Sequence, residues 1–169
     1  DTYNTPKRTY GFEITNDPTD LPIIGIIDTG ISNNTPLEPI LVDPGEQYDL
    51  TGTGLFVDNA DHGTGVASFA ALGYKPIPEY KGTFEADARL LPIKILDERE
   101  GGISQSRVTE LIRLAHIDYG VKIFTLTIGY AGFPMNDNEE FSSYARMLDQ
   151  LAYELDILVF ISTDRKSVV

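Results

Sequence analysis

The sequence contains no cysteine, two histidines and no long apolar run. The absence of cysteine excludes disulfides, thiolate nucleophiles and cysteine-ligated zinc. His62 and His116 lie 54 residues apart, which argues against a His-rich metal site. No apolar stretch approaches the roughly 18 residues of a membrane-spanning helix, so such a span is excluded. The remaining candidates for a functional site are therefore carboxylates, imidazoles and hydroxyls.

Basic residues are scarce as well. Lys and Arg number 13 against 26 Asp and Glu, which gives a net charge of −13, and the first 50 residues hold nine acids and two bases. Such acidity argues against nucleic acid or an anionic membrane surface as a partner. The chain starts without an initiator methionine or a signal pattern, so we expect a processed start and leave secretion and the cytoplasm both open.

The 169 residues suit one domain of alternating strands and helices. This order predicts a three-layer α/β/α fold with a mainly parallel sheet. Residues 1–20 are expected to form an irregular arm and 31–61 a loop with a strand near 40–48. Pro92 suggests a bulge or an irregular start in its strand. Strands are expected at 22–28, 89–96, 121–128 and 156–163, and helices at 62–73, from Ser104 or Ser106 to 119 and over 141–155.

Two motifs carry the candidate chemistry. Asp28 ends a β-branched strand within Ile26-Ile27-Asp28-Thr29-Gly30, and the carboxyl ends of parallel strands are where such sheets bind ligands. We expect Gly129 and Thr163 at the same rim. Asp28 could simply cap the next turn. It could also serve an aspartic protease, but the second Asp-Thr-Gly of such a site is missing, so that enzyme would have to be a homodimer.

The second motif is Asp61-His62-Gly63-Thr64-Gly65-Val66-Ala67. It places an imidazole at the start of a helix of small residues, which lets the helix lie close to the sheet and brings His62 toward the strand ends. A helix-start histidine without chemistry is the alternative, and it is the weaker one beside Asp28.

Together the two motifs resemble the subtilisin-like serine proteases, or subtilases. That family has a strand-end Asp-Thr-Gly followed, roughly thirty residues later, by His-Gly-Thr-x-Val-Ala, and here Asp28 and His62 are 34 apart. The resemblance extends over residues 21–163. It implies a serine endopeptidase with a polypeptide substrate, in which Asp28 orients His62 and His62 is the general base for a serine.

The same resemblance implies substrate positions. An extended peptide would pair with two edges, and Gly101-Gly102 could instead be a plain turn. The edges comprise Gly101, Gly102, Ile103, Thr127, Ile128 and Gly129.

Two departures from the family pattern stand out. The nucleophile motif Gly-Thr-Ser-x-Ala is missing, and Arg165 stands where the family has an oxyanion-hole asparagine. We therefore expect a partial catalytic domain that is inactive by itself. Either its oxyanion hole is altered or residues 164–169 are boundary residues foreign to the domain, and we favour the second. A non-catalytic binding module is the main alternative and a dimeric aspartic protease the lesser one.

The remaining expectations concern ions and self-association. No cofactor is expected. Calcium is possible for the family, but no acidic cluster has EF-hand spacing, and Asp58 and Asp61 are interpreted as solvated loop charges. A domain cut before the nucleophile segment would leave an apolar strand edge, so self-association through that edge is expected.

Overall fold

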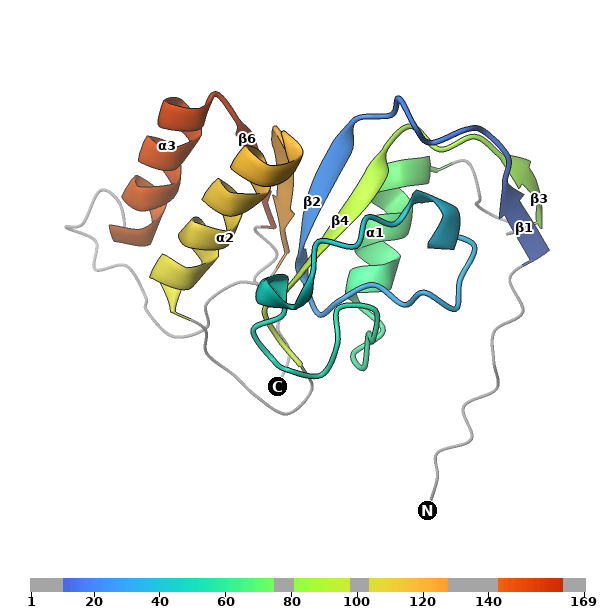
Figure 1. Ribbon diagram of the computed structural model, residues 1–169, viewed down its shortest axis with the longest axis horizontal. Helices are drawn as coiled ribbons and strands as arrows, with labels where there is room; N and C mark the ends of the chain where they lie inside the picture. The colour runs from blue at the N-terminus through green and yellow to red at the C-terminus, as the bar shows by residue number, and fades with distance from the viewer. Residues whose placement is uncertain (1–10, 75–80, 98–103, 128–142, 163–169) are drawn as a thin grey trace, which may run out of the picture.

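The computed structural model describes residues 11–74, 81–97, 104–127 and 143–162. Four parallel strands form the main sheet in the order β4-β2-β5-β6. Their bounds are Ile23–Asp28 for β2, Arg89–Lys94 for β4, Ile123–Leu126 for β5 and Leu158–Ile161 for β6. Helix α1 (Gly63–Leu72) lies on one face of this sheet, and α2 (Gln105–Tyr119) and α3 (Ser143–Leu155) lie on the other (Figure 1). The predicted α/β architecture with a parallel sheet is confirmed.

The alternation of side chains along the strands gives each face of the sheet its own core. Ile27 and Phe124 pack toward α2 and α3, whereas Ile26 and Leu90 pack toward α1. The side of α2 that meets the sheet has apolar residues at helical spacing, and Gly120 ends the helix in the left-handed conformation, as predicted. The buried residues of that side are Val108, Leu111, Ile112 and Ala115.

Ser104 occupies the predicted N-cap position of α2, but its hydroxyl does not cap the helix. It lies 2.6 Å from the hydroxyl of Ser106 instead. The position was therefore predictable from the sequence, and the hydrogen bond was not.

The strand expected near 40–48 is wrong. Short 3₁₀ helices occupy Glu38–Ile40 (η1) and Glu46–Tyr48 (η2), and single parallel bridges join Leu41 to Leu90 and Asp49 to Lys94. Pro44 and the positive φ of Gly45 lie between these contacts and prevent a continuous ladder.

The bulge expected at Pro92 is also wrong. β4 pairs with β2 in unbroken register from Ile23–Arg89 to Asp28–Lys94. The Arg89 N–H donates to the carbonyl oxygen of Pro22, just before β2, and the Ile95 N–H donates to that of Asp28, so the alternation along the strand turns the nitrogen of Pro92 to the outer side. A proline is tolerated there because no ladder hydrogen bond is required of it.

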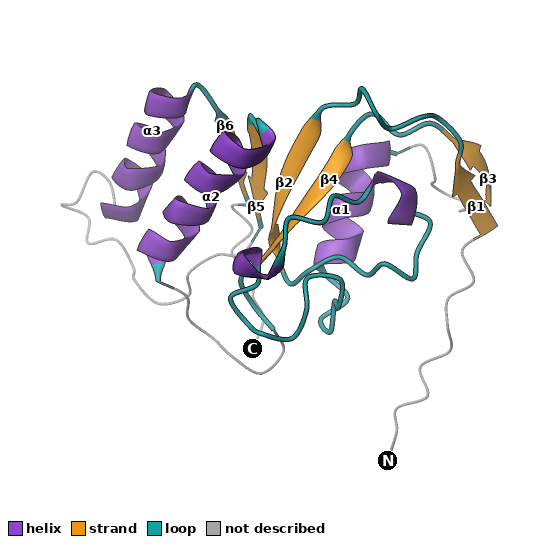
Figure 2. Ribbon diagram, in the orientation of Figure 1, coloured by secondary structure: helices purple, strands orange, loops and turns teal. Residues whose placement is uncertain are grey.

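A second, two-stranded parallel sheet was not predicted. β1 (Gly11–Ile14) pairs with β3 (Lys81–Phe84), and both lie apart from the main sheet (Figure 2). Residues 11–14 are thus a strand, although we expected them within an irregular arm. β1 turns only Phe12 and Ile14 inward, and three of the four residues of β3 are exposed, so neither strand is long or apolar enough to be recognised from its sequence.

β6 lies at the edge of the sheet and exposes apolar side chains. Leu158 is 61% exposed and Phe160 59%. An apolar groove lies between this strand and α1, lined by Phe69 of α1, Thr125 of β5 and Phe160 among others. An exposed apolar strand edge recruits other chains.

We therefore predict that the 169-residue chain self-associates through β6, and more strongly at high ionic strength, where its net charge of −13 is screened. Light scattering at low and high salt measures this, and Phe160→Lys is expected to weaken it. Tyr153→Lys, at a 90% exposed aromatic on α3, is the matched control and should change nothing. A monomer at high salt and high concentration would contradict the prediction.

Candidate active site

Asp28 ends β2, the strand that lies between β4 and β5 in the sheet. Its side chain is fully buried. Two donors meet its Oδ1: the Thr29 N–H at 2.7 Å and His62 Nδ1 at 2.8 Å, with the same ring nitrogen 3.0 Å from Oδ2. A buried carboxylate requires hydrogen-bond donors, and here they come from the next residue and from the start of α1.

His62 directly precedes α1, and its ring contacts Asp28. The predicted contact between the two side chains is therefore present at the carboxyl end of the sheet. Because carboxylate oxygens only accept hydrogen bonds, Nδ1 must carry the proton in this contact. The ring is 53% exposed while Asp28 is 0% exposed, so the imidazole joins a buried carboxylate to the surface.

Gly63 allows this close approach. A Cβ at this position would lie 2.2 Å from the carbonyl oxygen of Gly30 and 3.2 Å from Oδ1 of Asp28. The Gly63 N–H donates to the Thr29 hydroxyl at 3.0 Å. The small buried residues Ala67 and Ala71 continue this close packing along α1, in agreement with the motif analysis.

Thr127, predicted to lie at the substrate edge, follows β5 and donates its hydroxyl to Oδ2 of Asp28. Its side chain therefore belongs to the carboxylate's surroundings, a contact that the strand pattern did not indicate. The other predicted substrate positions lie outside the described residues; they are Gly101, Gly102, Ile103, Ile128 and Gly129. Thr163 and Arg165 lie outside them as well.

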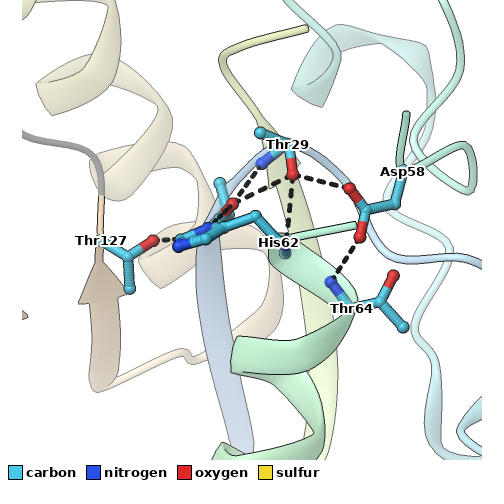
Figure 3. Close-up of polar contacts among 7 residues, drawn as sticks. Thr29, Asp58, His62, Thr64 and Thr127 are labelled. Atoms are coloured by element: carbon cyan, nitrogen blue, oxygen red, sulfur yellow. Dashed lines mark hydrogen bonds and ion pairs between the residues drawn. The ribbon is translucent and has the colours of Figure 1, made fainter. Parts of the chain in front are cut away.

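The interpretation of Asp58 as a solvated loop charge is wrong. Its Oδ1 accepts the Thr29 hydroxyl at 2.7 Å, and its Oδ2 accepts the Thr64 N–H at 2.7 Å (Figure 3). The sequence does contain a signal for this role. Asp58 is an acidic residue shortly before a helix, and acidic residues are favoured as caps at helix starts.

Lys94 is an unexpected buried charge in the same region. It ends β4 with a fully buried side chain, and its Nζ donates to the carbonyl oxygens of Val57 at 2.5 Å and Gly54 at 3.3 Å. These carbonyls belong to the loop that leads to Asp58. Lys94 therefore ties that loop to the sheet.

Asp49 organises the beginning of the same loop. It accepts hydrogen bonds from Thr51 and Gly52 on Oδ1 and from Gly54 N–H, at 2.6 Å, on Oδ2. Partial burial alone would raise the pKa of Asp49, but the hydrogen bonds from Thr51, Gly54 and Gly52 outweigh it and lower that pKa.

This lowered pKa predicts a pH-dependent contribution to stability. The ionised Asp49 carboxylate stabilises the folded protein at pH values above about 3.9, the usual pKa of aspartate. This contribution is lost as the pH falls through the lower pKa that Asp49 has in the folded state. The free energy of unfolding of the protein and of its Asp49→Asn variant should therefore converge below about pH 4. Urea denaturation across this range measures the difference, and a constant gap would contradict the prediction.

Ion and membrane features were sought within the described ranges. There, no group of three or more His, Cys, Asp or Glu side chains gathers into a potential metal site. Across the same ranges no helix is both long and apolar enough to cross a membrane.

The chain belongs to the subtilase family, whose profile matches residues 20–164. This match confirms the resemblance seen in the two motifs and places the chain in a family of serine peptidases. No curated protein matches it.

Among solved structures, the fold is similar to one described as the prenylagaramide maturation protease PagA, with a TM-score of 0.51 and 20% identity over 84% of this chain. This chain spans 45% of that one. The likeness supports the subtilisin-like fold.

Proposed function

We propose that Asp28 and His62 are the carboxylate and the general base of a serine endopeptidase of the subtilisin type. The observation that carries the proposal is the contact of 2.8 Å between a fully buried carboxylate and Nδ1 of a half-exposed imidazole. We further propose that the nucleophilic serine lies outside these 169 residues, because they lack the Gly-Thr-Ser-x-Ala motif, and that they have no peptidase activity by themselves. The PagA structure, of which this chain covers 45%, is consistent with a longer catalytic domain.

The chemistry follows from the orientation of the ring. With Nδ1–H donated to Asp28, Nε2 is the basic nitrogen and can take the proton of a serine hydroxyl as it attacks a peptide carbonyl. The resulting imidazolium is stabilised by Asp28 and returns the proton to the leaving amine. Water then repeats the cycle on the acyl-enzyme, so each group ends in its starting state.

The carboxylate's other partners support this role. The Thr29 N–H and the Thr127 hydroxyl both donate to Asp28 and so supply hydrogen bonds that its buried side chain requires. The dimeric aspartic protease is less well supported, because its carboxylate would need to face a second carboxylate with a shared proton. Here Asp28 faces an imidazole.

We further propose that the substrate is an extended polypeptide. It would pair with residues 101–104 and 127–129 by strand addition, as the resemblance implies. Thr127 lies at the end of β5, next to Asp28, so a peptide at this edge would pass beside the imidazole.

A fluorophosphonate probe tests the proposal, because it labels only activated serines. The complete gene product should be labelled, whereas the 169-residue chain and a His62→Ala variant of the gene product should not. His116→Ala is the matched control: His116 lies on α2 and contacts the carbonyl oxygen of Val121.

Two outcomes would contradict the peptidase proposal. Labelling that survives His62→Ala would remove the imidazole from the mechanism. A folded gene product that is neither labelled nor able to cleave peptides would favour the binding module, and pepstatin-sensitive cleavage at acidic pH would favour the aspartic protease.

A further inference from the structure

The start of α1 presents a hydrogen-bonding problem. The first N–H groups of a helix have no partner within the helix, and a side chain at the N-cap position commonly accepts from one of them. His62 occupies that position, and its side chain makes no capping bond, because the ring is turned to Asp28. The helix that carries the imidazole must therefore be capped by other residues.

Two side chains from outside the helix fill this role. Thr29 accepts from the Gly63 N–H at 3.0 Å, and Asp58 accepts from the Thr64 N–H at 2.7 Å. The negative charge of Asp58 also lies at the positive end of the helix dipole, which is the favourable end. His62 is thus free to contact Asp28 because Thr29 and Asp58 cap its helix.

The Thr29 hydroxyl has a single proton and two candidate acceptors. Asp58 Oδ1 lies 2.7 Å away and Asp28 Oδ1 3.1 Å away. The shorter contact takes the proton, and the second lone pair of the hydroxyl accepts from Gly63. Asp58 consequently keeps this proton off Asp28 and leaves Oδ1 of Asp28 for the Nδ1–H of His62.

The position of Asp58 is itself fixed from the sheet. The carbonyl oxygen of the preceding residue, Val57, accepts from the buried Nζ of Lys94 at 2.5 Å. A Cβ at Gly30 would lie 2.7 Å from the same carbonyl oxygen, so the loop also packs tightly against the chain that follows β2. The loop is held both by a cation and by close packing.

From these contacts we infer that Asp58 is a positioning residue for the Asp28–His62 pair. It orients the Thr29 hydroxyl and caps α1, and through both it holds His62 in the tautomer with the proton on Nδ1. Its importance for catalysis rests on the proposed function, whereas its effect on the imidazole does not.

Nitrogen NMR of the His62 side chain tests this inference, because the shifts of Nδ1 and Nε2 distinguish the tautomers. The protein should show the Nδ1–H tautomer at about pH 9, above the usual pKa of imidazole. In the Asp58→Asn variant, a single amide oxygen replaces the two acceptors of the Thr29 hydroxyl and the Thr64 N–H. The Thr29 proton is then free to bind Asp28 in competition with His62. We expect the ratio of the Nδ1–H tautomer to the Nε2–H tautomer to fall about fivefold, which corresponds to the net free energy of one hydrogen bond.

The matched control is Asp61→Asn. It removes the same charge beside His62, but no hydrogen bond among the described residues involves the Asp61 carboxylate. Asp61 has a φ of 54°, which asparagine tolerates. The tautomer ratio should not change. A shift as large as that of Asp58→Asn would show that charge alone acts on the ring, and it would overturn the inference.

A double-mutant cycle with Thr29→Val shows whether the effect of Asp58→Asn on the tautomer ratio depends on the Thr29 hydroxyl. Without the hydroxyl, Asp58→Asn should change the ratio by clearly less than fivefold. A lower melting temperature with no change in tautomer would reduce Asp58 to a structural cap and overturn its positioning role. Because these measurements need no peptidase activity, an inactive gene product would refute the proposed function and leave this inference standing.

Discussion

Under the proposed function, replacing Asp28 with asparagine in the complete gene product is expected to lower kcat by about 10⁴-fold, the loss that follows the Asp→Asn change in a Ser-His-Asp triad. Asparagine has nearly the same shape as aspartate, but it presents an NH₂ group as well as an oxygen. Asp28 faces the Thr29 N–H, the Thr127 hydroxyl and His62 Nδ1, all of which donate to it. An amide in this place cannot accept all three bonds, and an NH₂ group opposite Nδ1 favours the wrong tautomer.

The measurement is steady-state hydrolysis of a peptide substrate, with circular dichroism to establish folding. Asp156→Asn is the matched control, because Asp156 is exposed and has a φ of 52°, which asparagine adopts readily. Its activity should equal that of the unchanged protein. A loss below about tenfold for Asp28→Asn would exclude the orienting role of the carboxylate.

The second large effect is expected at Gly63. An alanine Cβ there would lie 2.2 Å from the carbonyl oxygen of Gly30, which is backbone and cannot rotate away. Either α1 must move from the sheet or the chain after β2 must shift, and both break the contact between His62 and Asp28. We expect a loss of about 3 kcal/mol in the free energy of unfolding, and a melting temperature lower by about 6–12 °C.

Gly65→Ala provides a control in the same helix. A Cβ at Gly65 meets no atom of the described residues within 4 Å, and alanine is the better helix former. The variant should be more stable by about 0.5 kcal/mol. Thermal unfolding of the two variants side by side measures the contrast, and equal melting temperatures would show that the approach of α1 to the sheet tolerates a side chain.

The pairing of Asp28 with His62 was predictable because local sequence patterns encode the positions of both residues. A β-branched strand that ends in Asp28 places the carboxylate at the rim of a parallel sheet, and a helix of glycine and alanine brings His62 to the same rim. Residues close in sequence, or repeated with helical spacing, encode such features. The buried face of α2 was predictable for the same reason.

The supporting network was not predictable, since it depends on contacts between distant segments. Hydropathy predicts an exposed Lys94, but carbonyl groups some forty positions earlier in the chain make its burial tolerable. Asp58 lies in a loop whose course depends on that lysine. Within the described part of the chain, the short strands β1 and β3 pair only with each other, and neither carries a strong pattern of its own.

The central place of β2 also has a kinetic consequence. Ile24 pairs with Leu90 on one side and with Ile123 on the other, so both neighbours of this strand come from distant parts of the chain. Closing such loops costs entropy before any contact is gained, and parallel sheets of this kind fold slowly. During that delay the isoleucine-rich strand is unpaired and prone to aggregate. The burial that isolates Asp28 in the finished protein is thus reached late, and the rate of folding limits how quickly the site forms.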